Sequence, residues 1–300
     1  SLSLLFYALL GVPFAWHKVK GGVQLDWVGY WIDVERFRVG VSLRRQQWIV
    51  KWLADKLESP EGLVRDVVEG PGRLSFAAGP LVHLRPFLGP IHAYVSAAHP
   101  QHYGRLPLIV RLVFILLSAA AKLNRFVECR PLRQDLGELF RLDAKAEGDL
   151  VVVGGWETGL SPDPAKARWF SLQLTRKNAG WAFSKGEAFR TIASLELFAF
   201  LVGIMLFVRP SQLSDYDARI GMTGVRFTAF TDNQSNQYLI DKLQTTRTPL
   251  CAGLMEFAWQ LSLRNVSASL LWIPRDQNTE ADALTNADFS AFTPANRIDT

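Results

Sequence analysis

Cysteine is scarce in this chain, with only Cys129 and Cys251 among its 300 residues. Two cysteines cannot build a disulfide framework or, by themselves, a four-ligand zinc site. We therefore expect a reducing compartment, in which Cys251 packs as a small hydrophobic side chain. Histidine is also uncommon, with five residues, and the spacing of His83, His92, His99 and His102 is not that of a metal site, which argues against a histidine-based metal centre.

Long hydrophobic runs are also missing. The longest runs after the opening residues, Leu112 to Ala121 and Leu197 to Val208, are well short of the roughly 20 residues that cross a bilayer. Arg111 and Glu196 adjoin them, which favours buried helices and no membrane partner. The opening LSLLFYALLGVPFAW lacks the basic region and cleavage site of a signal peptide. We expect an intracellular protein, in the cytoplasm or nucleus, and a fragment of a longer polypeptide, because the opening reads as the middle of a fold.

The composition that remains is that of a globular protein. Hydrophobic residues make up 49% and charged residues 20% of the chain, and its length suits two domains. Residues 1–140 carry 17 Lys and Arg against 11 Asp and Glu, whereas residues 141–300 carry 16 against 17. A basic half beside a carboxylate-rich half is typical of proteins that hold a polyanion next to a metal site. Ordinary scatter of charge is the alternative, and the balance alone does not decide between them.

Apolar spacing in the first half predicts a short hairpin followed by helices. The alternation in VQLDWVGYWID predicts one strand over 23–33, with a second strand at 38–41. Helices are predicted over 43–57, 63–78, 81–98 and 108–126, the second interrupted at Pro71-Gly72 and the third broken at Pro86 and Pro90.

The pattern of the second half is different, because strands dominate its beginning. Strands are predicted over 139–145, 150–156, 168–175, 225–231 and 267–273. Helices are predicted over 185–208, 235–243, 249–264 and 279–285, with a polar insert at 210–224. The order βββ-α-β-α-α-β-α indicates a mixed sheet with helices packed on its faces.

Four carboxylates occupy unusual places in this layout. Asp143 ends the first of these strands, Asp232 follows the fourth, and Asp282 lies in the closing helix. Glu196 lies in the nearly all-apolar helix segment IASLELFAF, where an uncompensated charge is costly to bury. Clustered carboxylates repel one another, and a hard divalent cation such as Mg²⁺ removes that repulsion.

Each of these acids has a structural explanation when it is taken alone. Asp232 could cap a helix, Asp143 could begin a turn, and Asp282 could lie on a solvated helix face. Glu196 is the hardest to explain in this way. The joint order of strand-Asp, helix-Glu, strand-Asp and helix-Asp is more specific than any single member.

The motifs around these acids, LDAKAEG, IASLELFAF, FTDNQSNQYLIDK and WIPRDQNTEADALT, resemble in order the four acidic motifs of the RNase H region of retroelement reverse transcriptases, of DIRS type or long-terminal-repeat-like. The intervals of 53, 36 and 50 residues agree with that family in scale. The resemblance implies that Asp143, Glu196, Asp232 and Asp282 are catalytic and bind two Mg²⁺ ions, for which Mn²⁺ can substitute. Arg275 to Asn278 stand where many cellular RNases H carry a histidine, so no histidine base is implied.

The first half resembles the end of the polymerase palm and the thumb. GVPFAWHKVK is similar to the segment whose lysine lies near the incoming nucleotide, here Lys18, and LDWVGYWID to the primer-grip hairpin, around Trp27 to Tyr30. GRLSFAAGPLVHLRPFLGPIHA resembles the thumb helices, with Arg73 and Arg85 as phosphate contacts. Solvated helix faces are the alternative for these arginines. Asn233, Ser235 and Asn236, at a helix start beside Asp232, are further candidates for nucleic-acid contact.

These observations predict an α/β protein in which a mixed five-stranded, RNase H-like sheet with flanking helices follows a mostly helical thumb and connection with a short hairpin. The predicted boundaries are 1–99 for palm end, primer grip and thumb, 100–138 for the connection and 139–300 for the nuclease. The predicted partners are an RNA–DNA hybrid and the upstream palm and fingers of the same polypeptide. The chain has no Tyr-x-Asp-Asp turn before the hairpin, so we do not expect it to polymerise DNA unaided. A non-catalytic hybrid-binding module, or a transposase or integrase of the same fold, are the alternatives.

Overall fold

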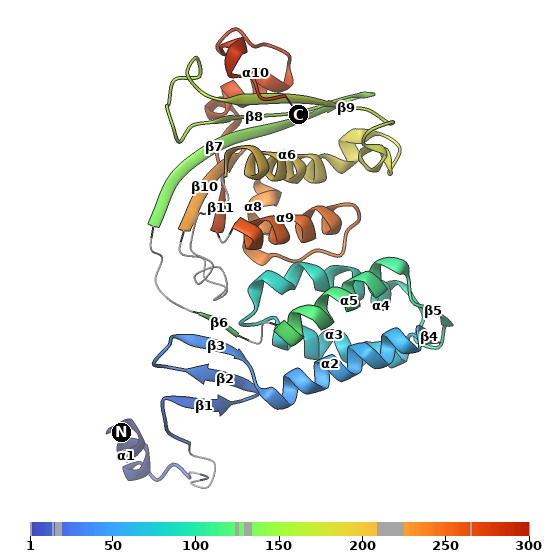
Figure 1. Cartoon of the computed structure of the whole chain (residues 1–300), viewed down its shortest axis with the longest axis vertical. Helices are drawn as coiled ribbons and strands as arrows, with labels where there is room; N and C mark the ends of the chain where they lie inside the picture. Colours follow the sequence, from blue (N-terminus) through green and yellow to red (C-terminus); the bar gives the residue numbers. More distant parts are fainter. Residues whose placement is uncertain are drawn as a thin grey trace.

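The computed structural model describes residues 2–13, 15, 20–123, 126–128, 134–208, 225–264 and 266–299. A mostly helical unit from the first half lies against a sheet unit from the second half, and the N-terminal helix lies at the end of the molecule farthest from the sheet unit (Figure 1). Lys18, Cys129 and the polar insert at 210–224 lie outside the described residues.

The described residues of the helical unit form short strands, five α-helices and one 3-10 helix. Its strands are β1 (Gln24–Trp27), β2 (Tyr30–Asp33), β3 (Arg38–Val41), β4 (Glu61–Leu63), β5 (Tyr103–Arg105) and β6 (Phe126–Glu128). Its helices are α1 (Leu2–Leu9), α2 (Leu43–Glu58), α3 (Arg65–Ala77), α4 (Gly89–Ala97), α5 (Leu108–Leu123) and the 3-10 helix η2 (Val82–Leu88). The strands β1, β2, β3 and β6 pair in that order, all antiparallel, while β4 pairs with β5.

Three element predictions for this unit were wrong. Residues 23–33 form two strands, because Val28 and Gly29 turn the chain with φ values of 50° and 85°. Two successive positive φ values are typical of a two-residue hairpin turn, which Val-Gly signals less clearly than Asn-Gly. Residues 81–98 begin as the 3-10 helix η2 rather than as an α-helix, with Pro86 inside it, and α3 continues through Pro71 without a break.

The sheet unit contains the remaining elements. Its strands are β7 (Gln134–Glu147), β8 (Leu150–Glu157), β9 (Trp169–Leu174), β10 (Val225–Thr231) and β11 (Val266–Trp272). Its helices are α6 (Ile192–Phe207), α8 (Gln234–Lys242), α9 (Leu250–Arg264), α10 (Thr279–Thr285) and the 3-10 helices η3 (Gly180–Phe183), η4 (Ala188–Thr191), η5 (Arg275–Gln277) and η6 (Pro294–Asn296). β7 begins at Gln134, before the boundary predicted at residue 139, and the α-helix predicted from residue 185 begins only at Ile192.

The five strands form one mixed sheet in the order β11-β10-β7-β8-β9. β7, β8 and β9 are successive antiparallel neighbours, whereas β10 pairs parallel to both β7 and β11. This strand order, with helices packed against the sheet, is the predicted α/β, RNase H-like fold, and the prediction is confirmed.

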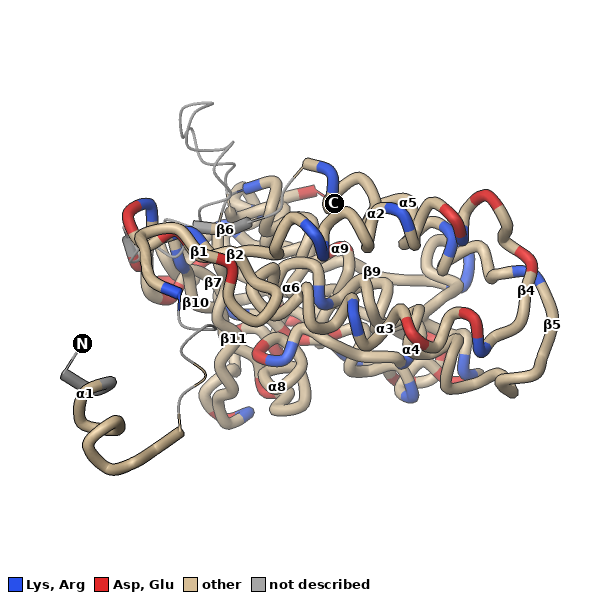
Figure 2. Tube along the Cα trace, turned by 90° about the horizontal axis from the view of Figure 1, so that it is seen from below, with Lys and Arg blue, Asp and Glu red and all other residues tan. Residues whose placement is uncertain are grey.

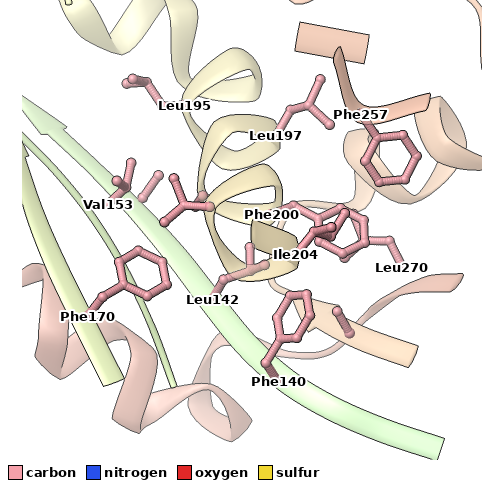
Figure 3. Close-up of a cluster of buried hydrophobic side chains, with 14 of the residues drawn as sticks. Phe140, Leu142, Val153, Phe170, Leu195, Leu197, Phe200, Ile204, Phe257 and Leu270 are labelled. Carbon is pink, nitrogen blue, oxygen red and sulfur yellow. The ribbon is translucent and has the colours of Figure 1, made fainter. Parts of the chain in front are cut away.

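The main core lies between the sheet and α6. Alternate residues of a strand point to opposite faces, so Phe140 and Leu142 of β7 and Val153 of β8 point toward this helix (Figure 3). α6 meets them with Phe200 and Ile204, both fully buried. The helix is apolar all round, which is typical of a helix enclosed by protein on most sides. Together with η4 it is long and apolar enough to cross a membrane, but 61% of its most apolar window is buried in this fold.

The opposite face of the sheet carries α10. A side chain at Gly154 of β8 would place its Cβ 2.9 Å from the Cβ of Leu284, so the glycine allows α10 to lie directly on the sheet. Trp156 and Trp169 pack beside Leu284 in a smaller cluster on this face. Since α10 carries Asp282, this close packing determines how near that acid lies to the strands.

The main core generates a stability prediction. Phe140 is fully buried and its ring centroid lies 5.7 Å from those of Phe200, Phe207 and Phe227. Phe140→Ala should therefore lower the free energy of unfolding by about 3–5 kcal/mol, measured by denaturant titration. The matched control is Phe189→Ala, because Phe189 is 52% exposed and its loss should change stability by about 0.5 kcal/mol or less. Equal effects of the two substitutions would contradict the described core.

Candidate metal centre

The site lies where two parallel strands separate. The pairing of β7 with β10 runs as far as Arg141 and Phe230, and beyond that point β7 pairs with β8 but no longer with β10. Asp143 follows on β7, and Asp232 follows the last residue of β10. Both acids therefore lie where the parallel pairing of β7 with β10 ends, a position similar to the strand ends at which open α/β sheets usually bind ligands.

Glu196 reaches this edge from α6. Its carboxylate accepts hydrogen bonds from the hydroxyl of Thr231, at 3.3 Å, and from the backbone amide of Ala144 on β7. Asn278 also bonds to the backbone of β7, because its side-chain amide donates to the carbonyl oxygen of Leu142 at 3.0 Å. The backbone edge of β7 that no longer pairs with β10 thus binds side chains from a helix and from a loop.

The carboxylates of Asp143, Glu196 and Asp232 converge. Each of the three residues offers one carboxylate oxygen, and these three oxygens lie within 4.8 Å of one another. Asp143 and Glu196 are each only 4% exposed, while Asp232 is half-buried. Burial first, and then the neighbouring aspartates, raise the pKa of Asp143 to about 6, although the hydrogen bond from Thr285 opposes them. Burial and the charges of Asp143 and Asp232 raise the pKa of Glu196 well above its ordinary value.

This donor set fits a hard divalent cation. Three carboxylates that approach one another in a poorly solvated place repel, and a divalent cation between them would offset both the repulsion and the burial cost. Oxygen ligands of this kind are those that Mg²⁺ and Mn²⁺ prefer. Among the described residues, this cluster is the group of acids, histidines and cysteines whose geometry suits a metal ion.

Asp282, the fourth predicted acid, lies beside this cluster but outside its 4.8 Å group. One of its oxygens accepts from Nη2 and Nε of Arg275, at 2.5 and 3.2 Å, and the other accepts from the side-chain amide of Asn286 at 2.9 Å. Nε of Arg275 also lies 4.0 Å from an oxygen of Asp232. The structure therefore brings three of the four acids together and places an arginine between the third and the fourth.

Sequence reasoning missed the hydroxyl groups that support the acids. Thr285 donates to Asp143 at 2.6 Å and also lies 2.9 Å from the backbone oxygen of Asp282, which links α10 to β7. Thr231 supports Glu196 and, in turn, accepts from the backbone amide of Asn233 at 3.1 Å. Spacing was the available signal, because Thr285 follows Asp282 by one helical turn and Thr231 directly precedes Asp232.

The three residues predicted at the helix start after Asp232 have structural partners. Asn233 caps α8 by accepting from the backbone amide of Ser235 at 3.1 Å. Asn236 is 1% exposed, and its side-chain amide donates to the carbonyl oxygen of Ala193 at 3.0 Å. Their nucleic-acid contacts stay a prediction, and Ser235 is the exposed member of the three.

The residues predicted in the thumb and hairpin are differently placed. Trp27 is 60% exposed, whereas Tyr30 stacks on Phe76 at 4.3 Å and donates its hydroxyl to the backbone of that residue. Arg85 donates to backbone oxygens at the end of α3, at 3.3 and 3.4 Å. Arg73 lies 4.2 Å from the ring centroid of Trp48 and forms an ion pair with Glu69.

Comparisons with known proteins find similar solved structures but no similar sequences. Neither a family model nor a curated protein sequence matches the chain. The RNase H1 of the halophilic archaeon Halobacterium salinarum NRC-1 is similar in structure at 16% identity and a TM-score of 0.32, covering 51% of this chain and 98% of that protein. A foamy viral protease-reverse transcriptase in complex with RNA/DNA hybrid is similar at 12% identity and a TM-score of 0.29, covering 83% of this chain and 29% of the viral protein. At these scores the assignment of the fold rests on the strand order and pairing.

The raised pKa values predict a pH-dependent response to metal. A carboxyl whose pKa is higher in the folded than in the unfolded protein stabilises the fold at low pH, and that contribution is lost as pH rises through about 6 for Asp143. Metal ligands must be deprotonated, so Mg²⁺ should bind more tightly above that pH. Thermal unfolding should show a larger Mg²⁺-induced rise in midpoint near pH 8 than near pH 5. Asp143→Asn should show little rise at either pH, and equal rises at both pH values in the unaltered chain would contradict the metal site.

Proposed function

We propose that this chain is an RNase H-type endonuclease that hydrolyses the RNA strand of RNA–DNA hybrids, as part of a retroelement reverse transcriptase whose polymerase active site lies elsewhere. One observation carries the proposal. Three acids that are far apart in the sequence, Asp143, Glu196 and Asp232, converge at the strand-end edge of an RNase H-like sheet. The order of the acidic motifs in the sequence supports it independently.

The roles of the residues follow from their positions. Asp143, Glu196 and Asp232 would hold one Mg²⁺ or Mn²⁺ ion, and Asp282 would join them in holding a second. When bound, two such ions would activate a water molecule and stabilise the leaving oxygen of a phosphodiester. Thr285 and Thr231 orient two of the carboxylates by hydrogen bonds, which limits the rearrangement needed when a cation binds.

A groove in the helical unit supports binding of a polyanion. This groove, which we call the arginine groove, has a volume of about 430 Å³ and is lined by Gly29, Ser42, Arg44, Arg45, Trp48 and Arg73. It lies between the β1–β2 turn and the start of α2, where the helix dipole adds further positive potential. Lys and Arg are otherwise spread along the chain rather than gathered in one stripe (Figure 2). Phosphates of a hybrid are the anions that this groove would hold, read by backbone shape rather than by sequence.

The first prediction for this function concerns the acids. Asp143→Asn and Asp232→Asn should each abolish cleavage of a labelled RNA–DNA hybrid in Mg²⁺, because each removes a charged ligand. Neither should destabilise the metal-free protein, since each also removes repulsion between buried carboxylates.

The control is Asp149→Asn, in the exposed turn between β7 and β8, which should cleave as the unaltered chain does. Duplex DNA and duplex RNA serve as the substrate controls. If the unaltered chain binds the hybrid without cleaving it, the chain is a non-catalytic hybrid-binding module rather than a nuclease. Large destabilisation by both Asp→Asn substitutions would instead make these acids structural.

The second prediction concerns the arginine groove. Arg44→Gln should weaken hybrid binding by Asp143→Asn protein and reduce the slope of log K against log salt by about 0.9, the value for one phosphate contact on a duplex. Arg65→Gln is the matched control, because Arg65 begins α3 next to β4, at the other end of the helical unit from the hairpin (Figure 1). Fluorescence anisotropy at several salt concentrations measures both. An equal slope for Arg44→Gln and Arg65→Gln would exclude the groove as the contact.

A further inference from the structure

Arg275 lies at the mouth of the metal centre between two acids from different elements. It donates twice to one oxygen of Asp282 and lies 4.0 Å from Asp232. Its positive charge lowers the pKa of both Asp143 and Asp232, opposing the effect of burial. The guanidinium thus already supplies part of the compensating charge that a second divalent cation would bring.

The backbone around Arg275 is held from both sides. Before it, the amide of Ile273 donates to the carbonyl oxygen of Thr231 at 2.9 Å, and the indole of Trp272 donates to that of Asp232 at 3.0 Å. After it, Asn278 is anchored to β7 through Leu142. The side chain itself is 74% exposed, so it can leave the acids without disturbing the fold.

Asp282 has one oxygen whose two lone pairs both accept from Arg275, so a cation can ligate that oxygen only in place of the guanidinium. Both of its oxygens already accept hydrogen bonds, one from Arg275 and the other from Asn286. Asn286 lies one turn further along the same chain segment as Asp282, whereas Arg275 reaches across from η5. A divalent cation that binds Asp282 would therefore replace Arg275 rather than Asn286, because the guanidinium and the cation compete for the same oxygen.

We propose that Arg275 is a positioning residue that keeps Asp282 out of the metal centre until a second divalent cation displaces the guanidinium from Asp282. This inference rests on the proposed two-metal function and names a feature of its regulation. The first ion binds at Asp143, Glu196 and Asp232, where no exchange with Asp282 is needed. The second ion binds more weakly, because it has to displace the guanidinium and bear its repulsion.

The test measures Mn²⁺ binding to the full chain by isothermal titration calorimetry, without nucleic acid. Arg275→Gln should tighten binding of the second ion by up to roughly fivefold, the upper end of the effect expected when an exposed charge pair is removed. Arg275→Lys keeps the charge but loses the second N–H donor to Asp282, so its second binding constant should lie between those of the unaltered chain and of Arg275→Gln. In the Asp282→Asn background, Arg275→Gln should have no effect on the second ion, which identifies Asp282 as the shared ligand.

Two results would overturn the inference. Unchanged Mn²⁺ constants in Arg275→Gln, with or without a lower melting temperature, would make Arg275 a structural residue. Loss of the second ion in Arg275→Gln would make it a promoter of metal binding. Cleavage of a hybrid by the unaltered chain is measured separately. If Arg275→Gln changes Mn²⁺ binding but the unaltered chain does not cleave the hybrid, the inference stands and the proposed nuclease activity is wrong. If the unaltered chain cleaves but Arg275→Gln leaves Mn²⁺ binding unchanged, the nuclease activity stands and the inference is wrong.

Discussion

Repulsion between the carboxylates of Asp143, Glu196 and Asp232 is the interaction around which the second half of the chain is built. Two of these acids are almost fully buried, and burial makes each charge more costly than it would be in water. The sheet keeps them together because β7 continues past the end of its pairing with β10 and places its acid beside the tip of the neighbouring strand. The backbone edge that is left unpaired is used again, as a donor and an acceptor for Glu196 and Asn278.

The apolar helix α6 makes this arrangement possible at the cost of a buried acid. Its packing against Phe140 and the strand residues around it fixes the helix on the sheet, so Glu196 has no alternative position in water. A less apolar helix could turn or slide to expose the carboxylate, and the cluster would then open. The stability of the core and the repulsion in the site therefore oppose each other, as is common where residues serve binding rather than folding.

Much of this arrangement could be predicted from sequence. The succession of strands and helices from β7 onward and the order of the four acidic motifs could be predicted, because they depend on local pattern and on position along the chain. The order of the strands within the sheet comes from the structure. The turn at Val28-Gly29 and the 3-10 start of 82–88 were not predicted, because apolar spacing cannot distinguish a continuous strand or helix from one that turns or tightens. The bond between Arg275 and Asp282 depends on side chains from two elements that meet only after the sheet has formed, so no local pattern contains it.

The helix α9 belongs to both halves of the molecule. Leu254 and Phe257 lie in the core beneath the sheet, whereas Ala258, with Met255 beside it, completes the core of the helical unit. A chain cut between the units would leave one of these surfaces in water, because α9 lies between the two units (Figure 1) and contributes to both cores. The two units should then unfold in one cooperative thermal transition. Backbone amide protons in the buried part of α5 should exchange with solvent no faster than those of α9.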